Sequence, residues 1–188
     1  MQNRGDSNAR TAQAEATRNN AGGSLPPLTD HEERQYNQFA RKMTHFHTYL
    51  QREYETAYEL ADGSFSKRGM SLIAYLDSVD EFRTHLTTHH DIEEVHIFPV
   101  LGKRMPEFRP NERHKTSHKL IHDGLDQLEA IVQKFRDTPS TYKPEVMRNT
   151  LDSFRDVLYH HLAEEVRDLS AENMRKYWTI SELSKIPF

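Results

Sequence analysis

The sequence of 188 residues contains no cysteine. This absence excludes disulfides, thiolate zinc sites, cysteine-ligated iron–sulfur clusters and cysteine nucleophiles together. Any metal site must therefore use histidine, aspartate and glutamate side chains. A chain without thiols also fits a reducing compartment, and we expect a cytoplasmic protein.

Long apolar runs and an excess of basic residues are missing as well. No stretch of 18 or more apolar residues occurs, so we predict no membrane-spanning helix. The residues that follow Met1 include no apolar stretch, and we therefore expect no secretory signal. The net charge is −4, and a mildly acidic chain is a poor match for nucleic acid, which needs a basic face.

Histidine is the residue type that the chain has in excess. There are 12 histidines, and all except His31 lie between His45 and His161. So heavy a load of imidazoles indicates metal chemistry or pH sensing.

The composition divides the chain into three parts. Residues 1–28 are rich in Asn, Gly, Ala, Arg and Ser and have little to bury, so we predict a disordered tail. Residues 29–172 carry long amphipathic segments and are predicted to form the domain. Residues 173–188 contain Trp178, Ile180, Leu183 and Ile186, and we expect this segment to pack on the domain.

Four segments carry apolar residues at steps of three and four, the period of an α-helix. They cover about 30–61, 72–97, 112–137 and 144–169, and Gly or Pro lies in each connection. No stretch shows convincing period-two alternation. Short connections between four amphipathic helices predict an all-α fold, an antiparallel up-down-up-down four-helix bundle.

Each of the four apolar stripes is interrupted by histidine at a position that should face the core. These residues are His47, His89, His118 and His161, and the second and fourth stripes also carry Glu93 and Glu165 one turn later. Burying a carboxylate costs on the order of several kcal/mol unless it is paired or bound to metal. Cations in the core would satisfy both the carboxylates and the imidazoles.

The register of two pairs is open by one residue. His90 and Glu94 have the same spacing as His89 and Glu93, and His160 and Glu164 have the same spacing as His161 and Glu165. We choose the pairs that continue the apolar stripes. The other four residues are then expected to flank or support the site.

The donor set predicts two metal ions. His118 and His122 form a third pair with i, i+4 spacing, which gives about five imidazoles beside two carboxylates. Nitrogen and oxygen donors without sulfur suit iron, manganese or zinc. This is more donors than one tetrahedral zinc uses. His31, His45 and His85 are off the stripes and are predicted to be surface residues, while His96 and His114 are left between the surface and a supporting role.

Four motifs resemble the hemerythrin-like (HHE cation-binding) family over roughly residues 29–169. They are Met43-Thr44-His45-Phe46-His47 in the first helix, His89-His90-Asp91-Ile92-Glu93-Glu94 with Phe98-Pro99 in the second, His118 to Leu125 in the third, and His161-Leu162-Ala163-Glu164-Glu165 in the fourth. The second and fourth motifs together are specific.

The resemblance implies a non-haem di-iron centre, with manganese or zinc as the lesser alternatives. It implies Glu93 and Glu165 as bridging carboxylates and His47, His89, His118, His122 and His161 as terminal ligands. His122 is the variable position, because some members use one histidine on the third helix. The partners implied are metal ions and a small diatomic ligand, since founding members bind oxygen and relatives sense iron or oxygen or take part in nitric-oxide chemistry. The founding carriers place Asp five residues after the fourth-helix histidine, whereas Glu165 follows His161 by four, which argues against oxygen transport.

Three functions are compatible with this site. The first is a metal-binding module that binds or senses oxygen, nitric oxide or iron without turnover. The second is a di-iron oxidoreductase, peroxidase-like or ferroxidase-like, although no separate acid, base or substrate motif argues for an enzyme. The third is a bundle whose histidines act as a pH switch. A ferritin-like bundle is disfavoured, because Glu93-x-x-His96 has no counterpart on the fourth helix.

Overall fold

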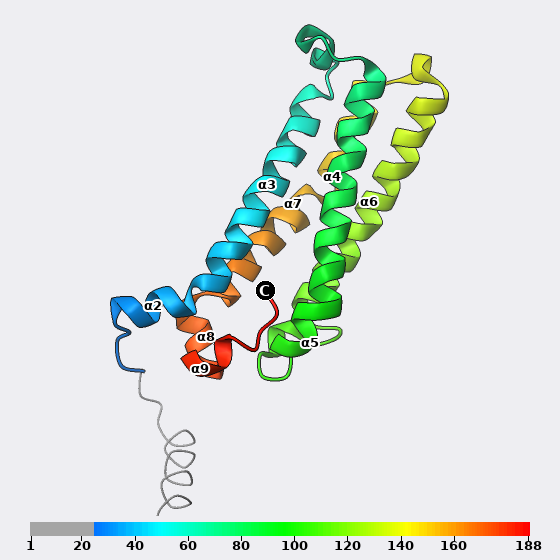
Figure 1. Ribbon diagram of the computed structural model, residues 1–188. Helices are drawn as coiled ribbons and strands as arrows, with labels where there is room; N and C mark the ends of the chain where they lie inside the picture. The colour runs from blue at the N-terminus through cyan, green and yellow to red at the C-terminus, as the bar shows by residue number, and fades with distance from the viewer. Residues whose placement is uncertain (1–24) are drawn as a thin grey trace, which may run out of the picture.

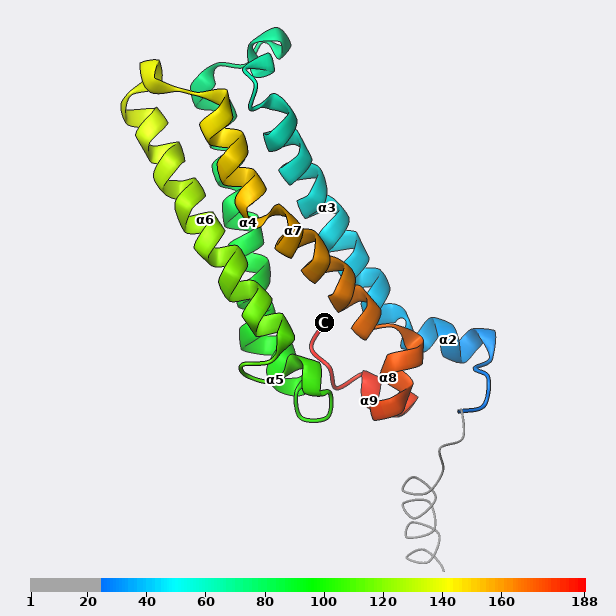
Figure 2. The ribbon, with the colours of Figure 1, turned by 180° about the vertical axis from the view of Figure 1, so that it is seen from behind.

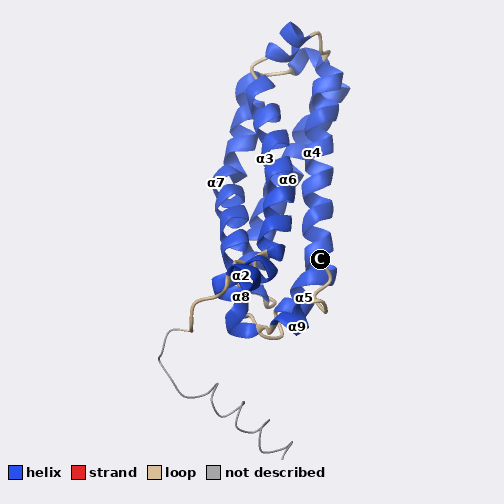
Figure 3. Cartoon of the chain, turned by 60° about the vertical axis from the view of Figure 1, so that its left-hand side comes forward, coloured by secondary structure: helices blue, strands red, loops and turns tan. Residues whose placement is uncertain are grey.

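The computed structural model describes residues 25–188, so most of the predicted tail lies outside the described residues. Four long helices run antiparallel: α3 (Gln38–Leu60), α4 (Leu72–Ile92), α6 (Arg113–Asp137) and α7 (Pro144–Asp168) (Figure 1). Within residues 25–188 there is no strand (Figure 3). The predicted all-α, up-down-up-down bundle is confirmed.

Each long helix packs against two others. α3 contacts α4 and α7, and α6 contacts the same two helices, so α3 and α6 lie diagonally opposite. Figure 2 shows the α6–α7 pair from behind. A 3₁₀ turn at Ser64–Arg68 joins α3 to α4, and a second at Pro139–Thr141 joins α6 to α7. Among the described residues, no helix is both long enough and apolar enough to cross a bilayer.

The first predicted helix is two helices. α2 (Asp30–Tyr36) starts at the N-cap Thr29, whose capping box with Glu32 satisfies free backbone donors. The chain turns at Asn37, and α2 points away from the bundle (Figure 1). Tertiary contacts hold the turn: the Asn37 side-chain oxygen accepts a hydrogen bond from the Ala171 backbone N–H at 2.7 Å, and the Tyr36 hydroxyl donates to the Trp178 carbonyl at 3.0 Å.

The second predicted helix contains a π-helical turn at Glu93–Ile97, followed by α5 (Phe98–Leu101). The Phe98 N–H reaches back five residues to the Glu93 carbonyl. Pro99 has no N–H to donate to the Val95 carbonyl, and its ring would clash with that carbonyl in a regular α-helix. The wider turn accommodates the proline without ending the helix.

The C-terminal part forms α8 (Ala171–Tyr177) and α9 (Ile180–Leu183) at the same end of the bundle as α2 and α5. Trp178 is buried, and its indole N–H lies 3.3 Å from the Met105 sulfur, beside the 3₁₀ turn Pro106–Phe108. Arg104 lies over the Trp178 ring and donates two hydrogen bonds to Glu182.

The interior of the described chain has two apolar clusters. One fills the bundle from Leu50 and Leu86 toward the α3–α4 connection, and the other joins the first turns of α3 to α5, α8 and α9. The histidines and glutamates at core positions lie between these two clusters. The apolar packing therefore holds the four helices on both sides of a polar layer.

Candidate metal centre

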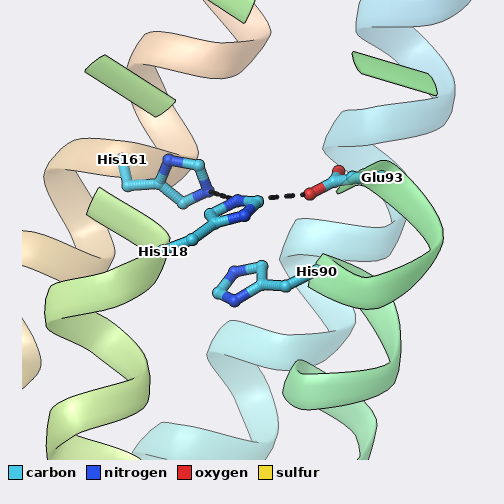
Figure 4. Close-up of side chains that lie close together, drawn as sticks. All are labelled: His90, Glu93, His118 and His161. Atoms are coloured by element: carbon cyan, nitrogen blue, oxygen red, sulfur yellow. Dashed lines mark hydrogen bonds and ion pairs between the residues drawn. The ribbon is translucent and has the colours of Figure 1, made fainter. Parts of the chain in front are cut away.

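The polar layer draws side chains from all four long helices and from the π-helical turn. His90, His161 and Glu165 are fully buried, and His47, Glu93 and His118 are nearly so. Two groups of four residues bring their donor atoms within 4.8 Å of one another: His90, Glu93, His118 and His161 in one, and His47, His89, Glu93 and Glu165 in the other. Figure 4 shows the first group, with its side chains directed toward one another.

Glu93 belongs to both groups. Its Oε1 lies 3.1 Å from His89 Nε2, and its Oε2 lies 3.5 Å from His118 Nε2. One carboxylate therefore faces an imidazole of each group. This is the arrangement that a carboxylate bridging two ions requires.

Glu165 also reaches toward both groups. Its Oε2 lies 3.4 Å from His47 Nε2 and 3.7 Å from His161 Nε2. Glu93 from the π-helical turn and Glu165 from α7 thus enter as two carboxylates between two sets of imidazoles.

The spacing of the nitrogens fits metal coordination. His118 Nε2 and His161 Nε2 are 3.1 Å apart, and His47 Nε2 and His89 Nε2 are 3.2 Å apart. Two nitrogens bound tetrahedrally to one ion at about 2.0–2.1 Å would be separated by roughly 3.3 Å. Each pair is therefore at a suitable separation for adjacent ligands of a single ion.

Several buried donors in this layer have no hydrogen-bond partner within the described chain. They are both ring nitrogens of His90, Nδ1 of His161, and all four carboxylate oxygens of Glu93 and Glu165. The carboxylate oxygens lie near imidazole nitrogens but lack the directions of hydrogen bonds. Buried polar atoms without partners are costly. Metal ions would satisfy them, so the residues present fit cations.

Burial keeps the imidazoles neutral. It lowers the pKa of His89 to about 4 and that of His118 to about 3, and it places the pKa values of His90 and His161 well below the usual range. A neutral imidazole offers the lone pair that a metal needs. The histidines are therefore ready to bind a cation near neutral pH.

The two carboxylates differ in charge state. Burial raises the pKa of Glu93, and the nearby Glu165 raises it further. Burial acts in the same direction on Glu165, but the nearby imidazoles, that of His47 first among them, outweigh it and lower the pKa of Glu165. Without cations, the pair carries about one negative charge, and cation binding would allow both groups to ionise.

Supporting hydrogen bonds orient two of the rings. His47 Nδ1 lies 3.1 Å from the Leu162 carbonyl, which only accepts, so Nδ1 carries the proton and Nε2 is left free for a metal. His118 Nδ1 lies 3.0 Å from Glu94 Oε1, and Lys115 pairs with the other oxygen of Glu94. Partners of this kind fix the ring and increase its basicity as a ligand.

A second buried cluster supports the α6–α7 side. His114 is fully buried, its Nε2 lies 3.0 Å from Asp168 Oδ2, and its ring stands edge-on to that of His161. Arg113 pairs with both Asp168 and Glu164. The i, i+4 spacing of His114 and His118 is a signal of this role in the sequence, whereas nothing in the sequence pattern marks Asp168.

The structure brings six of the seven residues predicted as metal ligands into the two groups. His122 lies outside them: it is partly exposed, and its ring centre is 5.3 Å from that of His90. His90, expected only to flank the site, lies inside. His89 and His90 both face Glu93, so both of the histidines that were alternatives on α4 contribute a donor. Glu94 instead pairs with the His118 ring and supports it.

On α7 the structure buries His161 and Glu165 and leaves the His160 side chain 70 % exposed. Glu164 is engaged by Arg113 and Arg167 at the edge of the site. This arrangement corresponds to the register chosen from the apolar stripe.

Comparison with known proteins identifies the protein family. The model of the hemerythrin HHE cation binding domain matches residues 38–171, and the chain belongs to this family. The match covers α3 to the start of α8 and therefore includes every residue of the two groups. The chain is accordingly a cation-binding helical bundle.

A search of curated proteins finds the dimeric xanthone biosynthesis cluster protein R11 of Cryptosporiopsis sp. (strain 8999). It is 27% identical over 103 residues, which are 52% of this chain and 38% of that protein. The chain thus aligns with well under half the length of this relative. No solved structure gives a significant match.

Proposed function

We propose that the protein is a non-haem di-iron protein in which Glu93 and Glu165 bridge two ions. In this assignment His90, His118 and His161 hold one ion and His47 and His89 hold the other. The observation that carries the proposal is the position of both carboxylates between two sets of imidazoles. Nitrogen and oxygen donors of this kind suit iron, with manganese and zinc as alternatives.

The ligand count leaves one ion open to a further ligand. When both carboxylates are counted for each ion, the His47–His89 ion has four protein donors and the other ion has five. Iron bound in this way would have a free coordination position for a further ligand and could change its oxidation state. Oxygen or nitric oxide is the ligand we propose for that position, and binding or sensing it is the function.

The test is metal analysis with absorption spectra of protein purified from iron-supplemented cells. We expect about two iron ions per chain, and visible absorption that changes between oxidised, reduced, oxygen-exposed and nitric-oxide-exposed samples. Purified protein without stoichiometric metal would refute the proposal. A content of two zinc or manganese ions per chain would support the dinuclear site but refute iron as its metal.

An oxidoreductase at the same centre is the second candidate. The observation that favours it is a cavity that opens beside His89 and Glu93. Consumption of peroxide or ferrous iron in many-fold excess over the site would support turnover. Consumption that stops at the stoichiometry of the site would support binding alone.

A further inference from the structure

A cavity of about 350 Å³ lies between α3 and α4 at the level of the polar layer. His89 and Glu93, both candidate metal ligands, form part of its wall. The cavity therefore leads from the surface to the His47–His89 side of the centre, where the proposed function leaves a coordination position open.

The mouth of the cavity is built from exposed apolar side chains. Phe46, Tyr49 and Ile92 all line it, and their exposed fractions are 54%, 52% and 49%. Few large apolar side chains are this exposed within the described chain, and three of them surround one opening. Clustered exposure of apolar side chains around a cavity is typical of a ligand site.

The deeper wall is apolar as well. Met43 and Leu50 are buried and face the cavity from α3, and Ile97 faces it from the π-helical turn. No lysine or arginine lines the cavity. Among its polar groups, His85 is paired with Glu53, and the Thr88 hydroxyl donates to the Thr84 carbonyl.

The last two residues of the sequence, Pro187 and Phe188, cover one side of the cavity. Figure 1 shows this segment extending toward the space between α3 and α4. The Phe188 ring lies 4.8 Å from that of Phe39, and Lys42 donates a hydrogen bond to the Phe188 carbonyl at the surface. Phe188 is partly buried and packs against the apolar cluster that contains Phe39 and Ile186, so its ring forms a fixed part of the cavity wall.

The size of the cavity exceeds what a diatomic ligand needs. A water molecule in the liquid occupies about 30 Å³, so 350 Å³ is roughly ten times the space of the smallest ligands. Cavities that bind small organic molecules begin at about 300 Å³. The volume therefore matches a molecule of two or three fused or linked rings.

We propose that this cavity binds a small, uncharged aromatic molecule with one edge toward His89 and Glu93. The aromatic class follows from the rings of Phe46, Tyr49 and Phe188 and from the adaptable side chain of Met43. The lack of lysine and arginine in the lining disfavours an anion, and the largely apolar wall disfavours a charge of either sign. The inference rests on the proposed function, because the metal centre is what the bound molecule would face.

The probe for the test is N-phenyl-1-naphthylamine, a neutral aromatic dye that fluoresces in apolar surroundings. The full chain is titrated with dye in its metal-free and zinc-loaded forms. We expect saturable binding of one dye per chain at micromolar concentration in both forms. The iron-loaded form should bind the dye with several-fold lower fluorescence, because iron beside the dye quenches it.

Three variants and one matched control test where the dye binds. Ile92→Asp places a charge at the mouth and should weaken binding at least tenfold. Ile73→Asp is the matched control, because Ile73 is also on α4, has an exposed fraction of 43% and does not line the cavity. Thr88→Trp fills the cavity from an exposed position and should abolish binding. Phe188→Ala should speed dissociation several-fold.

The outcomes separate this inference from the proposed function. Folded, iron-loaded protein that does not bind the dye overturns the aromatic site and leaves the di-iron proposal intact. Dye binding that Ile92→Asp and Thr88→Trp leave unchanged also overturns the inference, because the dye then binds elsewhere. Protein that binds the dye but takes up no metal refutes the di-iron proposal and leaves the cavity as an aromatic site without a metal beside it.

Discussion

At the scale of single residues, Glu93 connects the two groups of donors. Its two oxygens face His89 and His118, and both lack hydrogen-bond partners. Glu165 shares the space between the groups but cannot replace the oxygens that Glu93 supplies. Loss of the negative charge at position 93 should therefore affect both ions at once.

Replacing Glu93 by Gln tests this dependence. The amide keeps the shape but offers one weak oxygen donor in place of two, so we expect the metal content to fall from about two ions to below one per chain. Glu81→Gln is the matched control, since Glu81 is an exposed glutamate on the same helix. Metal analysis of both variants decides the matter, and a Glu93→Gln protein that retains two ions would contradict the bridging assignment.

His90 and His122 offer a second comparison at the same scale. His90 is fully buried in one donor group, whereas His122 is partly exposed and outside both groups. We expect His90→Gln to lose one ion, or to bind it at least tenfold more weakly, and His122→Gln to retain both. Metal titration followed by absorption measures the difference. If His122→Gln loses an ion and His90→Gln retains both, His122 is the ligand, as the family resemblance implies.

At the scale of helices, Gly124 of α6 packs directly against Phe154 of α7. A methyl group at this position would lie 2.6 Å from the Phe154 Cβ and ring. Alanine normally favours a helix over glycine by about 1 kcal/mol. Here the overlap should make alanine less favourable than glycine, because inserting a methyl group into packed surroundings costs about 1–3 kcal/mol.

Gly124→Ala should accordingly lower the free energy of unfolding, measured with urea, by at least 1 kcal/mol. Phe154→Ala alone should cost about 3–5 kcal/mol through the cavity that it leaves. The double variant provides the control: Phe154→Ala removes the ring but keeps the Cβ that would lie 2.6 Å away, so the cost of alanine at 124 should become smaller without disappearing. Additive effects would show that the two helices do not meet at this pair.

Much of the fold and part of the site could be predicted because they depend on helical periodicity. The stripes through Leu86 and Leu158 locate the core face of α4 and α7, and residues one turn apart on that face must enter the interior together. This is why the burial of Glu93 and Glu165 could be predicted from their spacing.

What the sequence did not reveal depends on contacts between distant segments. The break at Asn37 is held by Ala171 and Trp178, which lie more than 130 residues away. The π-helical turn adds a residue where periodicity assumes a regular helix, and His90 shares Glu93 with His89 instead of pairing with Glu94. The C-terminal residues beside the cavity likewise gave no periodic signal.

At the scale of the whole molecule, the polar layer divides the core into two apolar clusters and makes the free energy of unfolding depend on pH. His89, His90, His118 and His161 all have pKa values lowered by burial from 6.5. When the pH falls below 6.5, the unfolded chain takes up protons on these four imidazoles while the folded chain does not. The unfolded state therefore binds more protons, and stability must fall as the pH falls.

Glu93 acts in the opposite direction, because its pKa is raised above 4.5 in the folded state. Above about pH 4.5 the folded chain keeps a proton there that the unfolded chain releases. Four imidazoles less one carboxyl group leave a net uptake of up to three protons on unfolding. Below pH 4.5 the lowered pKa of Glu165 adds to the loss of stability.

Urea unfolding of the metal-free protein from pH 7.5 to 4.5 should therefore show stability that is greatest near pH 7 and decreases below 6.5. Each proton contributes a slope of about 1.4 kcal/mol per pH unit. His90→Gln should reduce the slope by about one proton. Metal-loaded protein should be more stable at pH 7.5 and lose that advantage over the same acid range, because protons compete with the ions for the imidazoles. A metal-free protein with equal stability at pH 7.5 and 5 would show that the imidazoles are not buried as neutral groups, and the ligand set would have to be assigned anew.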